Sequence, residues 1–226
     1  MSAPVITVDG PGGAGKGTLC FSLASTLGWR MLDSGALYRV VAHAALSRKL
    51  AFDDELALAT IAGSLNVSFL PAAGGLTRVV LDGDDISLQI RTEACGAAAS
   101  NVAALRGVRQ ALLERQRQMA VLPGLVADGR DMGTVVFPNA ALKIYLTASA
   151  RARAERRRRQ LKDSGGGDTL ARLLETIEER DERDQNRSES PLIPADDAIV
   201  VDSTDVAADV VLDTVLKAAR DRHLVD

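Results

Sequence analysis

Several residue types are scarce in this 226-residue chain, and each shortage excludes a class of protein. Only two cysteines are present, Cys20 and Cys95, far apart and without metal-ligand spacing, which excludes a disulfide-rich scaffold and favours the reducing cytoplasm. No apolar run approaches the roughly 18 residues that span a bilayer, and residues 1–4 carry no export signal, so we expect a soluble, unexported protein. A basic excess is also missing, because the net charge is −3, which argues against general affinity for nucleic acid or acidic membranes.

What remains is the composition of a globular protein. The chain is 46% hydrophobic and 25% charged, enough to bury one sizeable core. Arginine accounts for 22 of the 27 basic residues. Guanidinium groups suit bidentate recognition of phosphate, although a GC-rich genome produces the same bias and is the preferred explanation for the total.

Short apolar runs alternate with helical patterns along the chain. The runs predict strands buried on both faces, at residues 5–10, 29–33, 124–129, 142–147 and 198–204. Helices are expected at residues 16–27, 36–47, 102–119, 149–162, 169–186 and 205–222. This alternation predicts an α/β fold, with a five-stranded parallel sheet flanked by helices.

Two segments do not belong to this alternation. Residues 62–91 show period-two alternation around Asp82-Gly83, which is a hairpin signal, and predict a small antiparallel insert. The segment "KDSGGGD" at residues 162–168 has the glycine content of a flexible tip between two helices, with an ordinary surface loop as the alternative.

The stretch "ITVDGPGGAGKGTL", residues 6–19, has the form of a phosphate-binding loop between a strand and a helix. Backbone N–H groups and the helix N-terminus would face an anion, and Lys16 would reach the β and γ oxygens of a nucleotide. Gly17 stands where Ser or Thr is usual, and Thr18 offers its hydroxyl one residue later. The alternative is a glycine-rich turn that binds nothing. The ATP-binding residues expected here are Gly10, Pro11, Gly12, Gly13, Ala14, Gly15, Lys16, Gly17 and Thr18.

Five segments together resemble the bacterial cytidylate kinases, a family of nucleoside monophosphate kinases. They are "GKGT" (15–18), "MLDSGALYR" (31–39), "ADGRDMGTVVFP" (127–138), "KIYLTAS" (143–149) and "ERDERDQNR" (179–187), in order over nearly the whole chain. The resemblance implies a P-loop kinase fold and transfer of the ATP γ-phosphoryl group to CMP and dCMP. It also implies one domain over residues 1–226, with a monophosphate-binding region at 36–120 and a lid at 153–170. One position departs from the pattern, because the family usually has Ser where this chain has Gly12.

Transfer between two polyanions needs several cations and the exclusion of water. The resemblance assigns catalysis to Lys16, Arg130 and Arg180, phosphate binding also to Arg39, and a place near the acceptor nucleotide to Arg187. No general base is needed, because the acceptor phosphate is already largely ionised near neutral pH, so positioning and charge stabilisation would carry catalysis.

Recognition of the cytosine edge needs a carboxylate for the amino group and donors for the ring acceptors. By resemblance these are Asp131 for the amino group, with Ser100 and Arg109 for the ring, while Asp33 and Ser34 hold the acceptor from the other side. Asp33 can equally be a helix N-cap, and Ser100 can cap the helix expected near residue 102.

Magnesium and the lid complete the expected site. Thr18 and Asp128 are the expected Mg²⁺ residues, although a strand-end turn explains Asp128 nearly as well. In the run "RARAERRRRQ" (151–160) the resemblance assigns Arg153, Arg156 and Arg157 to the lid, with Arg153 and Arg157 contacting ATP. The expected partners are small nucleotides, without nucleic acid or membrane, for a monomer. Two alternatives stay open: another acceptor such as UMP, AMP or a small metabolite, and a nucleotide-binding or nucleic-acid-binding module that uses the phosphate loop as a switch without catalysis.

Overall fold

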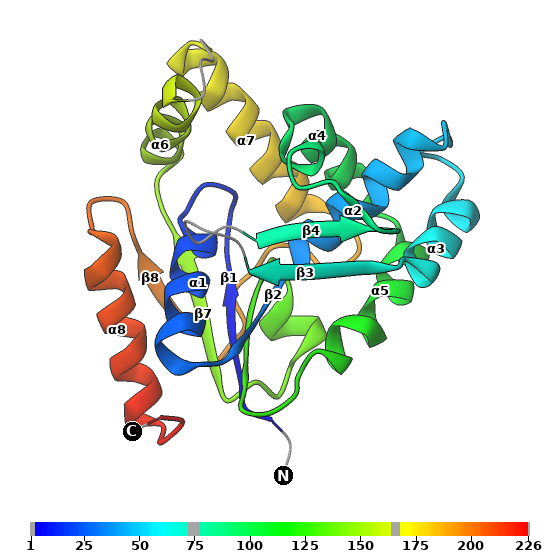
Figure 1. The fold of residues 1–226 in the computed structure, drawn as a ribbon. Helices are drawn as coiled ribbons and strands as arrows, with labels where there is room; N and C mark the ends of the chain where they lie inside the picture. Colours follow the sequence, from blue (N-terminus) through cyan, green and yellow to red (C-terminus); the bar gives the residue numbers. More distant parts are fainter. Residues whose placement is uncertain (1–2, 72–76, 164–167, 226) are drawn as a thin grey trace. The chain divides into compact units, whose positions relative to one another are not determined.

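The computed structural model describes residues 3–71, 77–163 and 168–225 (Figure 1). These residues form two compact units, each described here by itself. The first unit contains the chain up to Leu32 and from Met119 onward, and the second contains Asp33–Gln118. Within the described residues no helix is both long and apolar enough to cross a membrane.

A five-stranded sheet forms the centre of the first unit, in the order β2-β6-β1-β7-β8. Its strands are β1 (Val5–Asp9), β2 (Arg30–Asp33), β6 (Leu125–Gly129), β7 (Leu142–Thr147) and β8 (Ile199–Asp202). β1 pairs in parallel with β6 and β7, and β7 pairs in parallel with β8. Every residue of β1 is buried, as expected for a central strand covered on both faces. The five predicted strands and the α/β fold are therefore confirmed.

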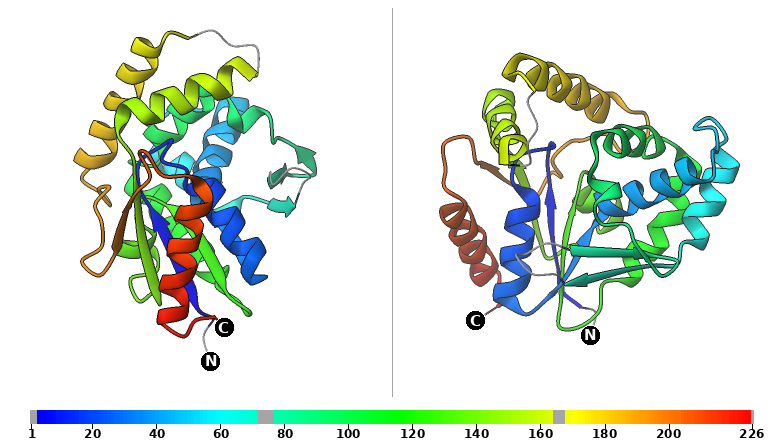
Figure 2. Two further views of the ribbon diagram at one scale, coloured as in Figure 1. Left: turned by 90° about the vertical axis from the view of Figure 1, so that its left-hand side faces the viewer. Right: turned by 45° about the horizontal axis from the view of Figure 1, so that its top comes forward.

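Helices complete the first unit. They are α1 (Lys16–Leu27), α6 (Ala150–Asp163), α7 (Leu170–Asn186) and α8 (Ala208–Asp221), with a short π-helical turn, η3 (Met132–Val136). α1 and α8 pack against each other (Figure 2). They share a hydrophobic core with the strands, which includes Ile6, Leu23 and Val215. η3 packs against β1 and β6, and α6 packs against α7. The phosphate loop thus leaves a rigid central strand and enters a helix anchored in the core.

The second unit combines helices with an antiparallel sheet. Its elements are α2 (Ser34–Ser47), α3 (Glu55–Ser64), β3 (Val67–Pro71), β4 (Thr77–Leu81), β5 (Asp84–Asp85), the 3₁₀ turn η2 (Gln89–Arg91), α4 (Glu93–Val102) and α5 (Arg106–Gln118). The sheet has the order β3-β4-β5, with antiparallel pairing throughout. The predicted hairpin at Asp82-Gly83 is confirmed, since both residues have positive φ and lie between β4 and β5.

Some predicted boundaries in the second unit are wrong. The helix expected at residues 102–119 begins later, as α5 at Arg106, because the N–H groups of Ala104 and Leu105 bond to carbonyls three residues back at the end of α4, which was not predicted. The antiparallel insert starts after residue 62, since α3 continues to Ser64. Ser100 lies inside α4 and is not the cap of a helix starting near residue 102. Residues 164–167 of the predicted flexible tip lie outside the described part of the chain.

Candidate active site

The loop between β1 and α1 has the backbone geometry of an anion-binding turn. At Gly10, φ is 145° and an added Cβ would lie 2.0 Å from the carbonyl oxygen of Leu146, so only glycine fits there. Gly15 forms the N-cap of α1 in the left-handed region and supplies no capping side chain. The first N–H groups of α1 therefore lack a side-chain cap at the position where a helix N-terminus favours an anion.

Lys16 lies buried at the start of α1, with 6% of its surface exposed. Its Nζ donates a hydrogen bond to the carbonyl oxygen of Pro11 at 3.0 Å and lies 3.9 Å from Oδ1 of Asp128. Burial lowers the pKa of Lys16, while the Asp128 carboxylate acts in the opposite direction. The ammonium group is held over the loop, where it can contact a phosphate that the loop binds.

Two arginines face the loop next to Lys16. A Cβ added at Gly12 would lie 3.5 Å from Nη2 of Arg130 and 3.5 Å from Nη1 of Arg180. Both guanidinium groups also act to lower the pKa of Lys16, which places the three cations within electrostatic range of one another. The structure therefore brings together the three predicted catalytic residues.

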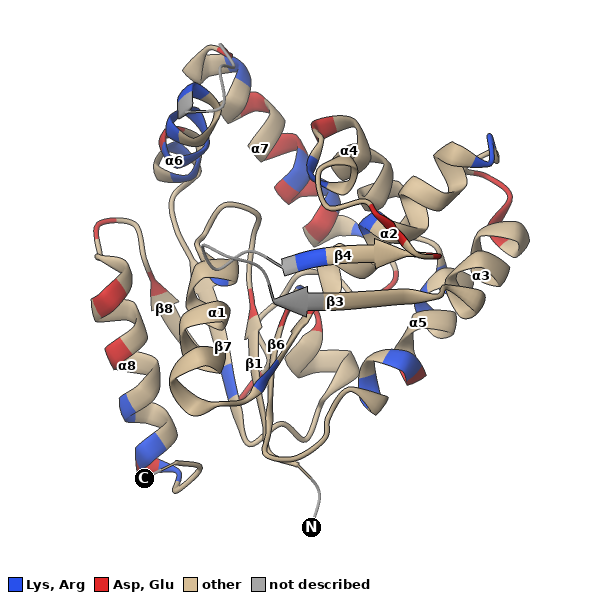
Figure 3. Cartoon of the chain, in the orientation of Figure 1, with Lys and Arg blue, Asp and Glu red and all other residues tan. Residues whose placement is uncertain are grey.

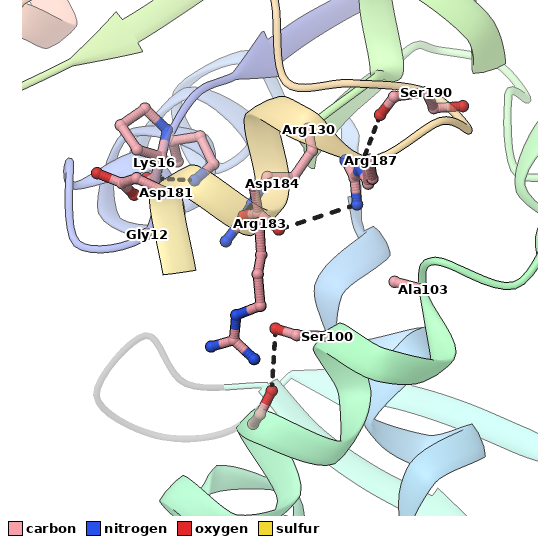
Figure 4. Close-up of polar contacts among 12 residues, drawn as sticks. Gly12, Lys16, Ser100, Ala103, Arg130, Asp181, Arg183, Asp184, Arg187 and Ser190 are labelled. Carbon is pink, nitrogen blue, oxygen red and sulfur yellow. Dashed lines mark hydrogen bonds and ion pairs between the residues drawn. The ribbon is translucent and has the colours of Figure 1, made fainter. Parts of the chain in front are cut away.

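Asp184 on α7 anchors this cluster, and the sequence analysis assigned it no role. Arg130 Nε donates to Oδ2 of Asp184 at 2.5 Å, and Nη1 of Arg187 lies 3.9 Å from Oδ1 (Figure 4). Burial, the largest single effect, would lower the pKa of Arg130 and raise that of Asp184, but the charge and hydrogen bond of each partner together with neighbouring opposite charges outweigh it and shift both pKa values the other way. Arg187 also donates from Nε to the carbonyl oxygen of Ser190 at 2.8 Å. "ERDERDQNR" carries the signal for this anchor, because Asp184 lies in it among the arginines.

Helix α6, rich in arginine (Figure 3), holds the loop from another direction. Arg153 is only 4% exposed; its Nε donates to Ala148 O at 2.9 Å and its Nη1 to Gly12 O at 3.2 Å. Its guanidinium pairs with Asp181 on α7, with Nη1 to Oδ1 at 3.0 Å. Arg156 donates to Ala14 O at 3.3 Å. These two arginines bind carbonyl oxygens of the phosphate loop, and Asp181, like Asp184, was not predicted.

A cleft of about 1110 Å³ opens beside the loop. Three segments of the first unit line it: residues 13–19, the face of α6 between Ala152 and Gln160, and the stretch from Ser203 to Val211. Arg157 lies in its wall and donates to Gln160 at 3.4 Å. Buried Ser203, also not predicted, lies 3.0 Å from the carbonyl oxygens of both Ala14 and Thr147. The cleft is large enough for a nucleotide.

The residues expected to hold Mg²⁺ lie next to Lys16. A Cβ added at Gly17 would lie 3.7 Å from Oδ2 of Asp128, while Thr18 is exposed and lines the cleft. Kinase-type Mg²⁺ sites use one or two protein oxygens together with water and substrate phosphates, so this donor set fits the ion chemically. Among the described residues no cluster of three or more His, Cys, Asp or Glu side chains could hold a metal by itself.

Asp131 lies two residues after the end of β6 and is buried at the N-cap of η3. Next to it, Asp9 accepts hydrogen bonds from the N–H groups of Met132 at 2.8 Å and Gly133 at 2.7 Å. Burial raises the pKa of Asp9 to about 6, against the effect of these two hydrogen bonds. Asp9 was not predicted, because its partners lie 123 and 124 residues away along the chain.

The remaining predicted site residues lie in the second unit. Asp33 is the N-cap of α2, since its Oδ1 accepts from Ala36 N at 2.9 Å, and buried Ser34 follows it. Arg39 donates to Ile90 O at 2.6 Å and its Nη2 would lie 3.0 Å from a Cβ added at Gly96. The Ser100 hydroxyl donates to the carbonyl oxygen of that same glycine at 3.3 Å. Arg39 and Ser100 thus meet the same turn of α4.

Arg109 on α5 is buried in the second unit. Its Nη1 donates to Ala103 O at 2.9 Å, and its guanidinium lies over the ring of Tyr38, 5.6 Å from the centroid. Stacking on an aromatic face fixes the plane of a guanidinium group and hence the direction of its N–H donors.

A parallel sheet with a glycine-rich loop at the end of its central strand, a lysine at the following helix and converging arginines define a P-loop protein of the kinase class. Comparison with known proteins narrows this class. The sequence pattern of the cytidylate kinase family matches residues 6–221. The chain belongs to the cytidylate kinase family.

Relatives from several bacteria are similar over nearly their whole length. A cytidylate kinase from Shewanella loihica is 53% identical, over 97% of this chain and 96% of the relative. A cytidylate kinase from Klebsiella pneumoniae is 55% identical, over 98% of this chain and 97% of the relative. A cytidylate kinase from Aeromonas hydrophila is 57% identical, over 96% of this chain and 94% of the relative.

Proposed function

We propose that this chain is an ATP-dependent kinase that transfers the γ-phosphoryl group of ATP to CMP and dCMP, releasing ADP and CDP or dCDP. Its relatives carry the name cytidylate kinase at 53–57% identity. The observation that carries the proposal is the approach of Arg130 and Arg180 to Gly12, beside Lys16. Charge on the transferring phosphoryl group spreads over its oxygens, and preorganised cations stabilise it.

The donor side of the reaction uses the phosphate loop and the cleft beside it. We assign the ATP phosphates to residues 10–18 and the rest of the nucleotide to the cleft, with Arg157 at its wall. Arg153, also in the wall of the cleft, is likewise assigned to ATP, and it binds Gly12 O as well. Mg²⁺, with Asp128 and Thr18 nearest to it, would neutralise charge on the phosphates when bound.

The acceptor side is assigned by the family pattern. Asp131 accepts from the cytosine amino group, and Ser100 and Arg109 donate to the ring acceptors. The other acceptor contacts are assigned to Asp33, Ser34, Arg39, Arg130, Arg180 and Arg187. Asp184 supports this set because it orients Arg130 and Arg187.

ADP production measured with ATP and Mg²⁺ against CMP, dCMP, UMP, AMP, GMP and dTMP tests the proposal. Rapid turnover confined to CMP and dCMP is the expected result. Rapid turnover with a different acceptor would keep the phosphate-loop assignment and reject the roles of Ser100, Arg109 and Asp131. No turnover with any acceptor, together with ATP binding, would indicate a nucleotide-binding module instead.

Three broader assignments accompany this function. We propose that residues 36–120 form the monophosphate-binding region and residues 153–170 the lid, within one domain over residues 1–226. We also propose a cytoplasmic monomer acting on small nucleotides, without nucleic acid or membrane partners. The buried thiols of Cys20 and Cys95 are compatible with a reducing compartment. Light scattering coupled to gel filtration would test the monomer, and a dimer would contradict it.

A further inference from the structure

Asp9 is a buried carboxylate that none of these roles uses. It is the last residue of β1, directly before the phosphate loop, and 5% of its surface is exposed. Its Oδ1 accepts from Met132 N at 2.8 Å and its Oδ2 from Gly133 N at 2.7 Å. Both donors belong to the start of η3, which follows Arg130 and Asp131 immediately. One side chain therefore joins the beginning of the donor loop to the segment assigned to the acceptor.

Besides these two hydrogen bonds, the backbone of the turn at Gly133 lies close to Asp9. A Cβ added at Gly133 would lie 3.3 Å from Oδ2 of Asp9 and 3.0 Å from Oγ1 of Thr7, so the turn lies directly against β1. Strand pairing also fixes the chain just before this turn, because Asp9 lies opposite Gly129 in the parallel β1–β6 pair. Two hydrogen bonds from adjacent N–H groups to one carboxylate fix the orientation of the turn as well as its distance.

The surroundings of Asp9 disfavour the ionised form of its carboxyl group. Burial disfavours its ionised form most strongly, and the like charge of Asp131 adds to that effect, while Lys16 opposes it. The two N–H donors offset part of the cost. An amide at this position could accept from one N–H only and would direct its own NH₂ group at the other.

We propose that Asp9 is a positioning residue for acceptor selection, which holds Arg130 and Asp131 in register with the phosphate loop through the N–H groups of Met132 and Gly133. The proposal rests on the proposed function, because Asp131 matters to selection only if it reads the base of the acceptor. Asp9 itself touches neither nucleotide in this assignment.

The test compares Asp9→Asn with the wild type by calorimetric titration of CMP alone and of ATP alone, together with KM for each substrate. We expect the dissociation constant for CMP to rise about 10-fold or more and that for ATP to change less than about 2-fold. Asp131→Ala should give the same pattern. Equal weakening for both nucleotides would show that Asp9 merely supports the loop, and unchanged CMP binding would also overturn the proposal.

Gly133→Ala tests the same contact from the donor side and decides the matter if Asp9→Asn does not fold. Its methyl group would lie 3.0 Å from Oγ1 of Thr7 and 3.3 Å from Oδ2 of Asp9, which is tighter than most Cβ contacts, so we expect the turn to shift away from β1 and CMP binding to weaken selectively. Gly63→Ala is the matched control, because a Cβ added there meets nothing within 4 Å, and it should leave both affinities unchanged. Asp213→Asn, on the exposed side of α8, controls for loss of one negative charge.

The wild-type titration separates failure of this proposal from failure of the proposed function. If the wild type binds CMP, and Asp9→Asn and Gly133→Ala bind it as tightly as the wild type does, only the positioning role of Asp9 is rejected. If the wild type takes another monophosphate, the CMP assignment falls, and the same comparison is made with that acceptor. A wild type that binds no monophosphate would remove the function and the role of Asp9 together.

Discussion

At Gly12 the chain places no side chain between two guanidinium groups of the proposed phosphate site. An added Cβ would meet Arg130 and Arg180 at 3.5 Å, which is ordinary van der Waals contact. Gly12 is also not among the glycines with positive φ. Its neighbour Gly13 differs, because φ is 82° and an added Cβ would lie 3.3 Å from Cβ of Arg153. The departure from the family's usual serine at position 12 therefore needs no compensating change in the backbone.

Gly12→Ser is expected to leave kcat within about 3-fold of the wild type and the free energy of unfolding within about 1 kcal/mol. Gly13→Ser, the control, should destabilise by about 1–2 kcal/mol because a side chain is forced into the left-handed region. Urea denaturation and ADP production measure the two quantities. A loss of kcat of about 10-fold in Gly12→Ser would mean that catalysis needs the open space beside Arg130 and Arg180.

Lys16→Ala removes the cation that lies over the loop. We expect kcat to fall by at least about 100-fold, because a preorganised charge aimed at the transferring phosphoryl group is lost. Lys217→Ala, at an exposed position on α8, should retain wild-type kcat. Steady-state ADP production under saturating substrates makes the comparison. Wild-type activity in Lys16→Ala would refute the assignment of residues 10–18 as the phosphate loop.

Between elements, the Arg153–Asp181 pair ties α6 to α7 and also to the phosphate loop through Gly12 O. Both side chains are shielded, with 5% and 18% exposed. Asp181→Asn should cost about 3 kcal/mol of unfolding free energy, because it leaves a buried guanidinium without its counter-charge. Glu155→Gln, in the exposed Arg151–Glu155 pair of the same helix, should cost less than about 1 kcal/mol. Urea denaturation measures both, and equal losses would show that the buried pair is not a structural tie.

The elements that could be predicted from sequence are those whose pattern is local. β1 and β6 are short apolar runs buried on both faces, and α1 follows a glycine-rich turn with its own signature. α3 and α4 were missed because neither has a clear apolar stripe. In α4 four of the ten residues are alanine, and Gly96 lies against Arg39. η3 could not be predicted at all, since its first N–H groups bond to a carboxylate 123 residues earlier.

The residues of the candidate site also divide into those identified from the sequence and those whose partners are distant along the chain. Lys16 and the loop glycines belong to one contiguous motif, and the arginines were assigned by resemblance. Asp181, Asp184 and Ser203 escaped notice because their partners, Arg153, Arg130 and the loop carbonyl of Ala14, lie 28, 54 and 189 residues away. A single sequence shows which side chains carry charge, but the fold decides which of them meet.

At the scale of the whole molecule, the chain order places the second unit, Asp33–Gln118, between two parts of the first. The only tryptophan, Trp29, belongs to the first unit and packs against its core. Fluorescence of Trp29 therefore reports unfolding of the unit that contains the phosphate loop, α6, α7 and Asp9, and it suits measurements of stability on that unit.

The pH dependence of this stability follows from Asp9. Its pKa is about 6 in the folded protein and 3.8 as the ordinary value, so below about pH 3 it is protonated in both states. As pH rises towards 6, the unfolded chain ionises first, which removes about 3 kcal/mol of stability at 1.36 kcal/mol per pKa unit. Asp9→Asn lacks this titration.

The stability of the wild type minus that of Asp9→Asn should accordingly fall by about 2 kcal/mol between pH 4 and pH 7, since the unfolded chain is already partly ionised at pH 4, and urea denaturation with Trp29 fluorescence measures it. Asp184 contributes with the opposite sign, because its lowered pKa makes it lose stability as pH falls. That contribution is common to both proteins and cancels in the difference. A difference that stays flat across this range would mean that Asp9 ionises as readily in the folded protein as in the unfolded chain, and that its burial carries no electrostatic cost.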